Sequence, residues 1–167
     1  MTPFEQVAGT FWDTAVSYGV LAPLTPGAVI TAERQLGVKL PGALVQLLQI
    51  QNGGAVADAW SECSSEPNFY AEDCVPFDHL FGIGPATDTG ATTLLDTPYL
   101  VQEWDLPPGV VLLSGQGHYW VALDYRTCGT EGEPTVTWID NEMDHELHLA
   151  SNFRTFVENL MPATHLR

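Results

Sequence analysis

Basic residues are scarce in this chain. Five Lys and Arg stand against 21 Asp and Glu in 167 residues, which gives a formal net charge of −16. A surface of this sign repels nucleic-acid phosphates and anionic membranes, and it attracts basic partners. We therefore expect no binding to nucleic acid or to a membrane, and we expect a charged partner to be basic.

Long apolar runs and a signal-like beginning are also missing. No run approaches the roughly 20 residues that a membrane-spanning helix needs. The chain opens with MTPFEQVAGTFWD, which lacks a basic region followed by an apolar one. Cys63, Cys74 and Cys128 are odd in number and form no CxxC pair, which argues against a disulfide framework or a zinc site. We expect a cytoplasmic protein with free thiols, although Cys63 and Cys74 could pair in an oxidising compartment.

Catalytic motifs of defined spacing are absent as well. The chain has no GxSxG elbow, no HExxH helix and no phosphate-binding P-loop. Gly115-Gln116-Gly117 fits a hairpin turn better than a phosphate cradle, which needs a helix behind the glycines. The run from Asp140 to His148 resembles a calcium loop but lacks the required glycine. We expect no enzyme, no metal and no cofactor. A small metal-dependent or thiol enzyme, with His118 and Asp124 orienting a base, is the third hypothesis.

Helix signals fill the first third of the chain. The apolar spacing predicts three helices, over residues 2–19, 25–37 and 41–52. Thr2 and Glu5 have the spacing of a capping box, and a Thr-Pro pair opens both of the first two helices. Gly37 and Gly53 are expected to close the second and third, because glycine accepts the left-handed conformation that ends a helix.

Strand signals fill the second half. Short apolar runs separated by polar turns predict strands over residues 110–113, 119–125, 135–139 and 146–149. Consecutive strands with short turns indicate an antiparallel meander. The final apolar stripe, from Phe153 to Leu160, predicts an amphipathic helix with Ser151 or Asn152 as its cap.

The middle of the chain is less regular. Residues 55–78 predict a solvated, partly irregular segment with room for a short strand, and residues 80–84 predict another short strand. Residues 94–104 have a helical pattern that Pro98 should break in two. An apolar content of 45% over 167 residues suits one domain, residues 1–167. We expect an α+β fold: N-terminal helices packed on a largely antiparallel mixed sheet, closed by a C-terminal helix.

Four of the five tryptophans are predicted core residues. They fall in periodic apolar stripes: Trp12, Trp104, Trp120 and Trp138. Trp60 stands beside the acidic middle segment instead. There it would suit an interface as an aromatic anchor, or it would be partly buried under the loop, and both interpretations stay open.

Short motifs follow one another in a recognisable order. They are Glu33, Leu36-Gly37, Leu40-Pro41 and Asn52-Gly53-Gly54, then Phe81-Gly82-Ile83-Gly84, Trp104 with Leu106-Pro107, GHYWVALDYR at 117–126, Pro134-x-Val136-x-Trp138-Ile139-Asp140, and Leu149-Ala150-x-Asn152-Phe153-x-x-Phe156-Val157. This set, from about Thr31 to Leu160, resembles the SUKH superfamily, also called the Smi and Knr family. Leu44 departs from it, since many relatives have an aromatic there. The matched residues include an expected structural signature of Pro41, Asn52, Gly53, Gly54, Trp120, Asp124 and Trp138.

The resemblance implies a fold and a role. The family's fold is a helical N-terminal part packed on a mixed sheet. Many bacterial members look like immunity proteins, each of which neutralises a cognate toxin of a polymorphic toxin system, often a nuclease. Other members resemble regulators of fungal cell-wall assembly that act as protein-binding hubs. An immunity protein is the leading interpretation and a regulatory interaction module is the alternative. No catalytic residue carries over.

The negative charge makes the immunity interpretation physically coherent. A nuclease toxin grips phosphates and is basic around its site, so an acidic partner is steered to it. We expect the free protein to be a monomer and the toxin to meet one of two acidic stretches. The candidate toxin-binding residues are Trp60, Glu62, Glu66, Glu72, Asp73 and Asp78 in the first, and Glu131, Glu133, Glu142 and Asp144 in the second.

Overall fold

The first helix begins where the sequence predicted but ends early. In the computed structural model, which describes residues 2–85 and 90–163, helix α1 spans Pro3–Ala8 and starts at the expected capping box. The prediction that it reaches Gly19 is wrong. The backbone of residues 11–13 instead bonds to residues 55–57, with Asp13 donating to Ala55 at 3.0 Å. Extended pairing with a distant segment therefore replaces the local hydrogen bonds of a helix.

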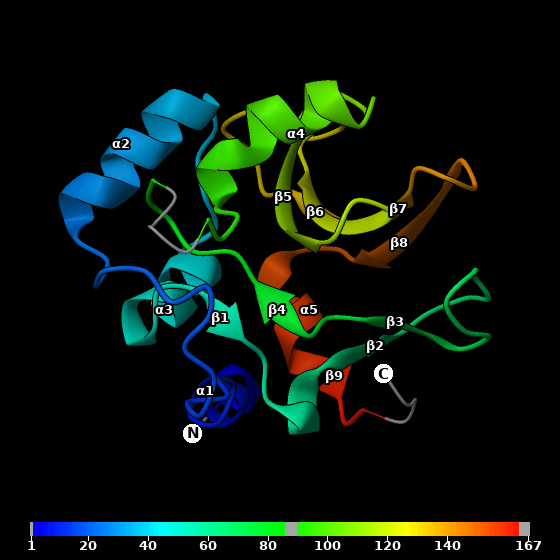
Figure 1. Cartoon of the computed structure of the whole chain (residues 1–167), viewed down its shortest axis with the longest axis horizontal. Helices are drawn as coiled ribbons and strands as arrows, with labels where there is room; N and C mark the ends of the chain where they lie inside the picture. Colours follow the sequence, from blue (N-terminus) through cyan, green and yellow to red (C-terminus); the bar gives the residue numbers. More distant parts are fainter. Residues whose placement is uncertain (1, 86–89, 164–167) are drawn as a thin grey trace.

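The next two helices are confirmed. Helix α2 spans Pro26–Leu36, is capped by the Thr25 hydroxyl and ends at Gly37, whose φ is 72°. Helix α3 spans Gly42–Ile50 after Pro41 and buries a leucine face against the core. Both helices lie on one side of the molecule, with α1 below them (Figure 1).

The predicted meander is the largest sheet. Its strands β5 (Val110–Gly115), β6 (Tyr119–Asp124), β7 (Thr135–Asp140) and β8 (His145–Ala150) pair in sequence order, all antiparallel. The short helix η2 (Leu94–Asp96) and helix α4 (Thr97–Glu103) lie beside β5, with the break near Pro98 that the sequence predicted. The curved meander and α4 form the upper right of Figure 1.

The prediction of one mixed sheet needs correction, because the described residues form three separate antiparallel sheets. Strand β1 (Gly54–Ala55) pairs with β4 (His79–Leu80), and β2 (Glu62–Ser64), which follows the short helix η1 (Asp58–Trp60), pairs with β3 (Cys74–Pro76) and β9 (Leu160–Met161). Leu160 was expected in the last helix, but it lies in β9. There it pairs with Cys63 of β2, which replaces the hydrogen bonds of a further helical turn.

The C-terminal helix closes the core, as predicted. Helix α5 spans Phe153–Glu158, and the side chain of Asn152 caps it. Phe77, which follows β3, packs edge-on against Phe156 of α5, with ring centroids 4.9 Å apart. Helix α5 therefore joins the three-stranded sheet β3-β2-β9, called the small sheet below, to the main core. Trp12, Trp120 and Trp138 are buried as expected, but Trp104 is 40% exposed. It lies at the end of α4, where its indole ring lies against Gly117 of the β5–β6 turn and keeps part of its surface in solvent.

Asn52 and Gly53 tie three segments together. The buried Asn52 amide donates to the carbonyls of Ala22 and Ile83 at 2.8 and 2.9 Å, and its oxygen accepts from the Ile83 N–H at 2.8 Å. Gly53 has a φ of 92°, and a Cβ at this position would lie 2.7 Å from both Gly19 O and Gly82 N. The amide satisfies backbone groups that would otherwise be buried without partners, and the glycine permits their approach.

The two conformational glycines predict different costs for alanine. Gly37 also has a positive φ, of 72°, but open space surrounds it. Gly37→Ala should lower the free energy of unfolding by about 1 kcal/mol, through backbone strain alone. Gly53→Ala should lower it by more than about 2 kcal/mol, because neighbouring backbone must also move. Urea denaturation of both variants checks this, and equal losses would contradict the close approach.

Candidate protein-binding surface

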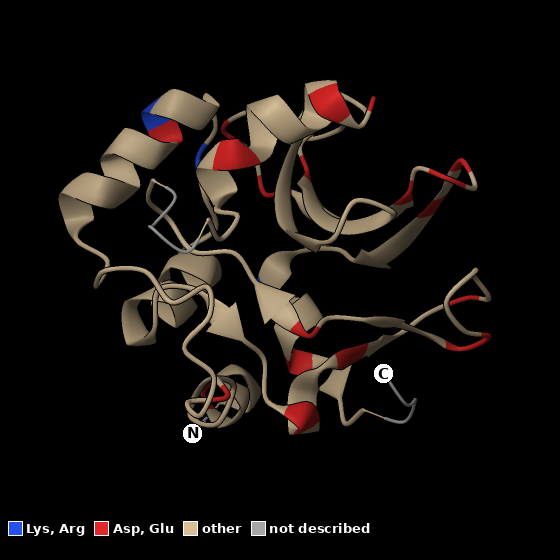
Figure 2. Cartoon of the chain, viewed as in Figure 1, with Lys and Arg blue, Asp and Glu red and all other residues tan. Residues whose placement is uncertain are grey.

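Two hairpins extend from the same side of the molecule and carry acidic tips. One is the β2–β3 hairpin and the other is β7–β8, and in Figure 2 the acidic positions mark the ends of both. A shallow groove joins them, lined by Pro67, Asn68 and Phe69 of the first and by Met143 and His145 of the second. We call this the two-tip surface; its exposed residues are Glu66, Pro67, Phe69, Glu72, Asp73, Glu142, Met143 and Asp144.

Asn68 shapes the first tip. Its side-chain amide donates to Ser65 Oγ, the Glu66 carbonyl and the Cys74 carbonyl at 3.0–3.1 Å. Its carbonyl oxygen accepts from the N–H groups of Tyr70 and Ala71 at 2.8 and 3.1 Å. One side chain thus satisfies the backbone of an otherwise irregular loop. The loop holds Phe69 outward, and the Phe69 side chain is 75% exposed.

Asp140 shapes the second tip. One oxygen of this buried carboxylate accepts from the N–H groups of Glu142 and Met143 at 3.0 and 2.9 Å. Asp144 follows with a φ of 50°, a conformation that Asp tolerates better than most residues. This turn leaves Met143 56% exposed. The Glu142 carboxylate contacts His118 Nδ1 at 2.5 Å.

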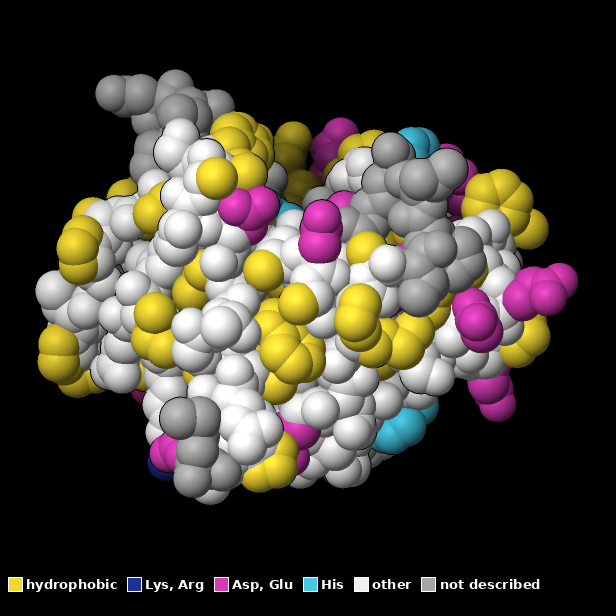
Figure 3. All heavy atoms as spheres, turned by 90° about the horizontal axis from the view of Figure 1, so that it is seen from below, with side chains coloured by type: hydrophobic (Ala, Val, Ile, Leu, Met, Phe, Trp, Pro, Cys, Tyr) yellow, Lys and Arg dark blue, Asp and Glu magenta, His cyan; other side chains and the backbone are white. Residues whose placement is uncertain are grey.

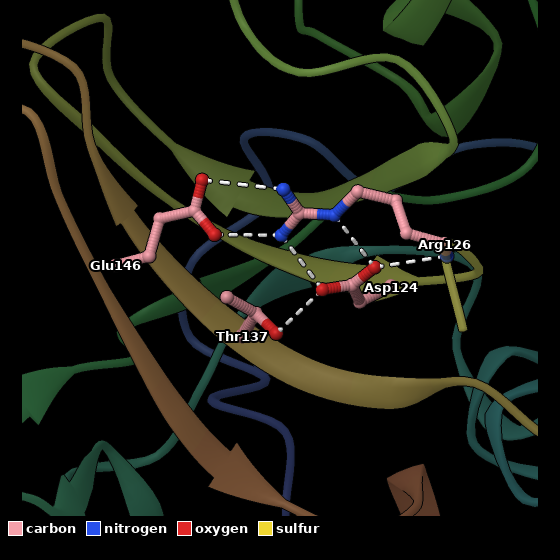
Figure 4. Close-up of polar contacts among 4 residues, drawn as sticks. All are labelled: Asp124, Arg126, Thr137 and Glu146. Carbon is pink, nitrogen blue, oxygen red and sulfur yellow. Dashed lines mark hydrogen bonds and ion pairs between the residues drawn. The ribbon is translucent and has the colours of Figure 1, made fainter.

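An ion-pair network anchors the strand that carries the second tip. The Arg126 guanidinium binds Asp124 at 2.8 Å and Glu146 of β8 at 2.6 Å, and the Thr137 hydroxyl donates to Asp124 at 3.1 Å (Figure 4). Burial alone would raise the pKa of Asp124, but hydrogen bonds from Arg126, its charge and the Thr137 hydroxyl outweigh burial, so the pKa lies below its ordinary value. The network links β6, β7 and β8 on the sheet face opposite Trp138.

The two-tip surface combines apolar anchors with one sign of charge. Neither tip segment, 65–73 or 141–145, contains Lys or Arg. Among the basic residues that the structure describes, Arg126 is engaged with acids and Arg154 lies by Glu158 and the Phe4 ring. In the view from below, acidic and hydrophobic side chains gather at the right-hand end, on the side of the β2–β3 tip (Figure 3). Exposed aromatic and Met side chains that are surrounded by charged residues are typical of protein-binding surfaces.

The structure gathers some predicted site residues and separates others. Glu66, Glu72 and Asp73 come near Glu142 and Asp144, although about 70 positions separate them in sequence. Glu131 and Glu133 lie on the β6–β7 loop, at the opposite end of the meander, where a groove also contains Lys39. The acids therefore group differently from the two predicted stretches: Glu142 and Asp144 lie with the first stretch, and Glu131 and Glu133 lie apart from it.

Two of the predicted toxin-binding residues are less accessible than expected: one is buried and the other is half-buried. Glu62 is 0% exposed in β2, so it offers no surface to a partner, and its prediction as a contact residue is corrected. Trp60 is half-buried against the core, and its indole N–H donates to Thr10 Oγ1 at 3.0 Å. Asp78 is exposed between β3 and β4, outside both tips.

Three residues of this surface were missed from the sequence. Phe69 and Met143 are the apolar anchors, and Asn68 positions the first of them. A signal was available for Asn68, because Pro-Asn before two aromatics is a turn pattern. An aromatic at 69 within an acidic loop also marked an exposed anchor. Met143 had no such mark, since only the turn geometry turns it outward.

The sequence raised a thiol enzyme and a His118–Asp124 base as alternatives, and the described residues do not assemble either site. His118 contacts Glu142, and Asp124 is paired with Arg126. Asp124 therefore does not orient His118 as a general base. Burial raises the pKa of Cys63 to about 11. Burial and the charges of Glu62 and Asp73 raise the pKa of Cys74 to about 12. Both thiols are protonated near neutral pH, whereas a nucleophile must be a thiolate.

All three cysteines are free, and Cys63 and Ser64 stand opposite Val75 and Cys74, so the two buried thiols project to opposite faces of the small sheet. No group of three or more His, Cys, Asp or Glu within residues 2–85 and 90–163 is placed to hold a metal ion. In the same ranges no helix is long and apolar enough to cross a membrane.

The fold is α+β, as the sequence predicted, and its exposed acids and apolar anchors are of the kind that suits protein binding. The chain belongs to the SMI1 / KNR4 family (SUKH-1), which matches residues 23–159. This family comprises immunity and regulatory protein-interaction domains, and the resemblance seen in the sequence is confirmed. Comparison with curated proteins gave no match.

The Asp124 network predicts a dependence of stability on pH. Asp124→Asn should lower the free energy of unfolding at pH 7 by about 2 kcal/mol, a value reduced for the partial exposure of Arg126. Because the folded-state pKa of Asp124 is lowered, its contribution is full above about pH 4 and is lost as pH falls through that lower pKa. Urea denaturation of both proteins at several pH values measures the difference.

The control is Glu103→Gln, which removes one exposed negative charge that has no ion pair among the described residues. This variant should stay within about 0.5 kcal/mol of the parent. A difference for Asp124→Asn that persists undiminished at pH 2 would contradict the assignment of the lowered pKa.

Proposed function

We propose that this protein is an immunity protein, which binds a basic toxin of a polymorphic toxin system through the two-tip surface and neutralises it. The observation that carries the proposal is the exposure of Phe69 and Met143 within an acidic rim that contains no Lys or Arg. Membership of a family that includes immunity domains supports it. We place the encounter in the cytoplasm, which suits the three free thiols.

The chemistry of a toxin partner explains both parts of this surface. A nuclease must hold phosphates, so basic groups surround its site, and the rim acids would be attracted to those groups. Charge of this kind speeds the encounter, whereas apolar anchors slow dissociation by burying their area. Fast and tight binding are both required where one free toxin molecule does damage.

The function is tested by capture followed by a toxicity assay. The chain carries a tag at its N-terminus, which lies away from both tips in Figure 1, and is used to capture partners from its native cells. We expect one basic polypeptide at one-to-one stoichiometry. Raising NaCl from about 50 mM to about 500 mM should weaken the complex, because salt screens the rim charges.

The captured polypeptide is then expressed alone and with this chain in a host that lacks both. An immunity protein predicts growth arrest in the first case and growth in the second. Several unrelated partners, or a partner that leaves growth unchanged, would contradict the proposal and favour a regulatory interaction module.

The surface assignment predicts the outcome of charge reversal. Glu66→Lys with Glu72→Lys should raise the Kd for the toxin by roughly tenfold or more and flatten its salt dependence. Glu131→Lys with Glu133→Lys changes the same number of charges at the opposite end of the meander and should raise the Kd less than about threefold. Calorimetric titration at two salt concentrations measures both. Equal effects of the two pairs would reject the two-tip surface while leaving neutralisation intact.

The apolar anchors predict a complementary effect. Phe69→Ala should raise the Kd by roughly tenfold, mainly through faster dissociation, because an anchor loses its buried area. Phe69 is 75% exposed in the free protein, so the substitution should leave the free energy of unfolding within about 0.5 kcal/mol. Surface plasmon resonance separates the two rate constants. A slower association with unchanged dissociation would contradict the anchor role.

A further inference from the structure

A second recess lies next to the two-tip surface, between the small sheet and the meander. Its volume is about 160 Å³. The residues that line it come from the end of β3 and the start of β4 on one side and from the β5–β6 hairpin on the other; they include Pro76, Asp78, His79, Ser114, Gln116 and Tyr119. None of the interactions described above uses this recess.

The recess offers hydrogen-bond acceptors. Ser114 is only 6% exposed, and it lines the recess with a hydroxyl oxygen that can accept a hydrogen bond. Its strand partner Val121 lines the same recess, so the Ser114 side chain projects to this face of the sheet. The Gln116 amide nitrogen donates to the Tyr119 hydroxyl at 2.6 Å, which leaves the Gln116 carbonyl oxygen to accept.

The charge at the recess is negative. Asp78 is exposed at its rim and forms no ion pair with the residues that the structure describes. Burial lowers the pKa of His79, although the charge of Asp78 acts in the opposite direction. The imidazole is therefore largely neutral at pH 7 and does not balance the charge of Asp78. The Tyr119 ring adds an aromatic face, which attracts cations.

We propose that this recess is a socket for one arginine side chain of the protein partner. A guanidinium has five N–H donors and no acceptor, which matches a carboxylate, an amide carbonyl oxygen and a hydroxyl oxygen beside an aromatic ring. A lysine ammonium has three donors on a point charge and cannot stack on the ring in the same way.

The position of the socket connects it to the two-tip surface. The Tyr119 ring lies 6.3 Å from Tyr70 of the first tip loop and 6.0 Å from Trp138, measured between centroids. Trp138 in turn lies 6.1 Å from the ring of His145, which lines the groove between the tips. We therefore place the socket within reach of a partner that is seated on the tips. In this respect the inference rests on the proposed function and names one group that the partner supplies.

The socket is tested without the partner. The full chain, labelled with ¹⁵N, is titrated with Nα-acetyl-arginine amide, and Nα-acetyl-citrulline amide serves as the neutral isostere. We expect saturable shifts at residues 78, 79 and 114–119 with arginine and none with citrulline. Asp78→Asn should weaken arginine binding about tenfold or more, because a charge-assisted hydrogen bond is lost.

The matched control is Asp144→Asn, which removes the same charge from the neighbouring tip and keeps a residue that tolerates a φ of 50°. It should leave the Kd for the arginine amide within about twofold. Unsaturable shifts, equal binding of citrulline amide, equal binding of Nα-acetyl-lysine amide, or retained binding by Asp78→Asn would each overturn the socket. Because no toxin is present, such a failure leaves neutralisation untouched, and a failed neutralisation assay leaves the socket untouched.

Discussion

The architecture depends on the backbone junction at Asn52-Gly53-Gly54. Three hydrogen bonds of the Asn52 amide hold the end of α3 to residue 22 and residue 83, segments that otherwise share no regular pairing. The close passage of Gly53 by Gly19 and Gly82 is possible only without a side chain. This junction starts β1, which aligns β4, and β4 leads into the contact of Phe81 with Leu113 of the meander. The helical part and the sheet are thereby fixed to one another.

The surface follows a second constraint, the excess of acids. With a net charge of −16, most carboxylates must stay apart and in water. The buried exceptions are held by neighbours, as Asp124 is by Arg126, or are used to shape a turn, as Asp140 is in the second tip. Many of the remaining acids occupy hairpin tips and loops, and others lie on helices, as Glu103 does on α4. At the two tips, these acids lie beside the exposed apolar side chains of Phe69 and Met143.

Much of the fold was readable from local patterns, and the misses have a common cause. The caps at Thr2, Thr25 and Asn152 and the four meander strands depend on near neighbours, so their sequence signals were sufficient. The first helix was overextended because residues 11–13 bond to residues 55–57. Strands β2, β3 and β9 were not predicted individually, because each is only two or three residues long and because β9 pairs with β2 from the other end of the chain. Long-range pairing leaves no periodic trace in segments so short.

The sequence by itself determined the charge, the family and the α+β class, because composition and ordered motifs do not depend on folding. Only the tertiary structure decided which acids lie near one another. It brought residues 66–73 beside residues 142–144, moved Glu131 and Glu133 to the far end, and buried Glu62. It also placed Asp78 beside Ser114 and Tyr119 in one recess. The reason is that a site needs distances between side chains, and hairpins of separate sheets acquire them only when the sheets pack.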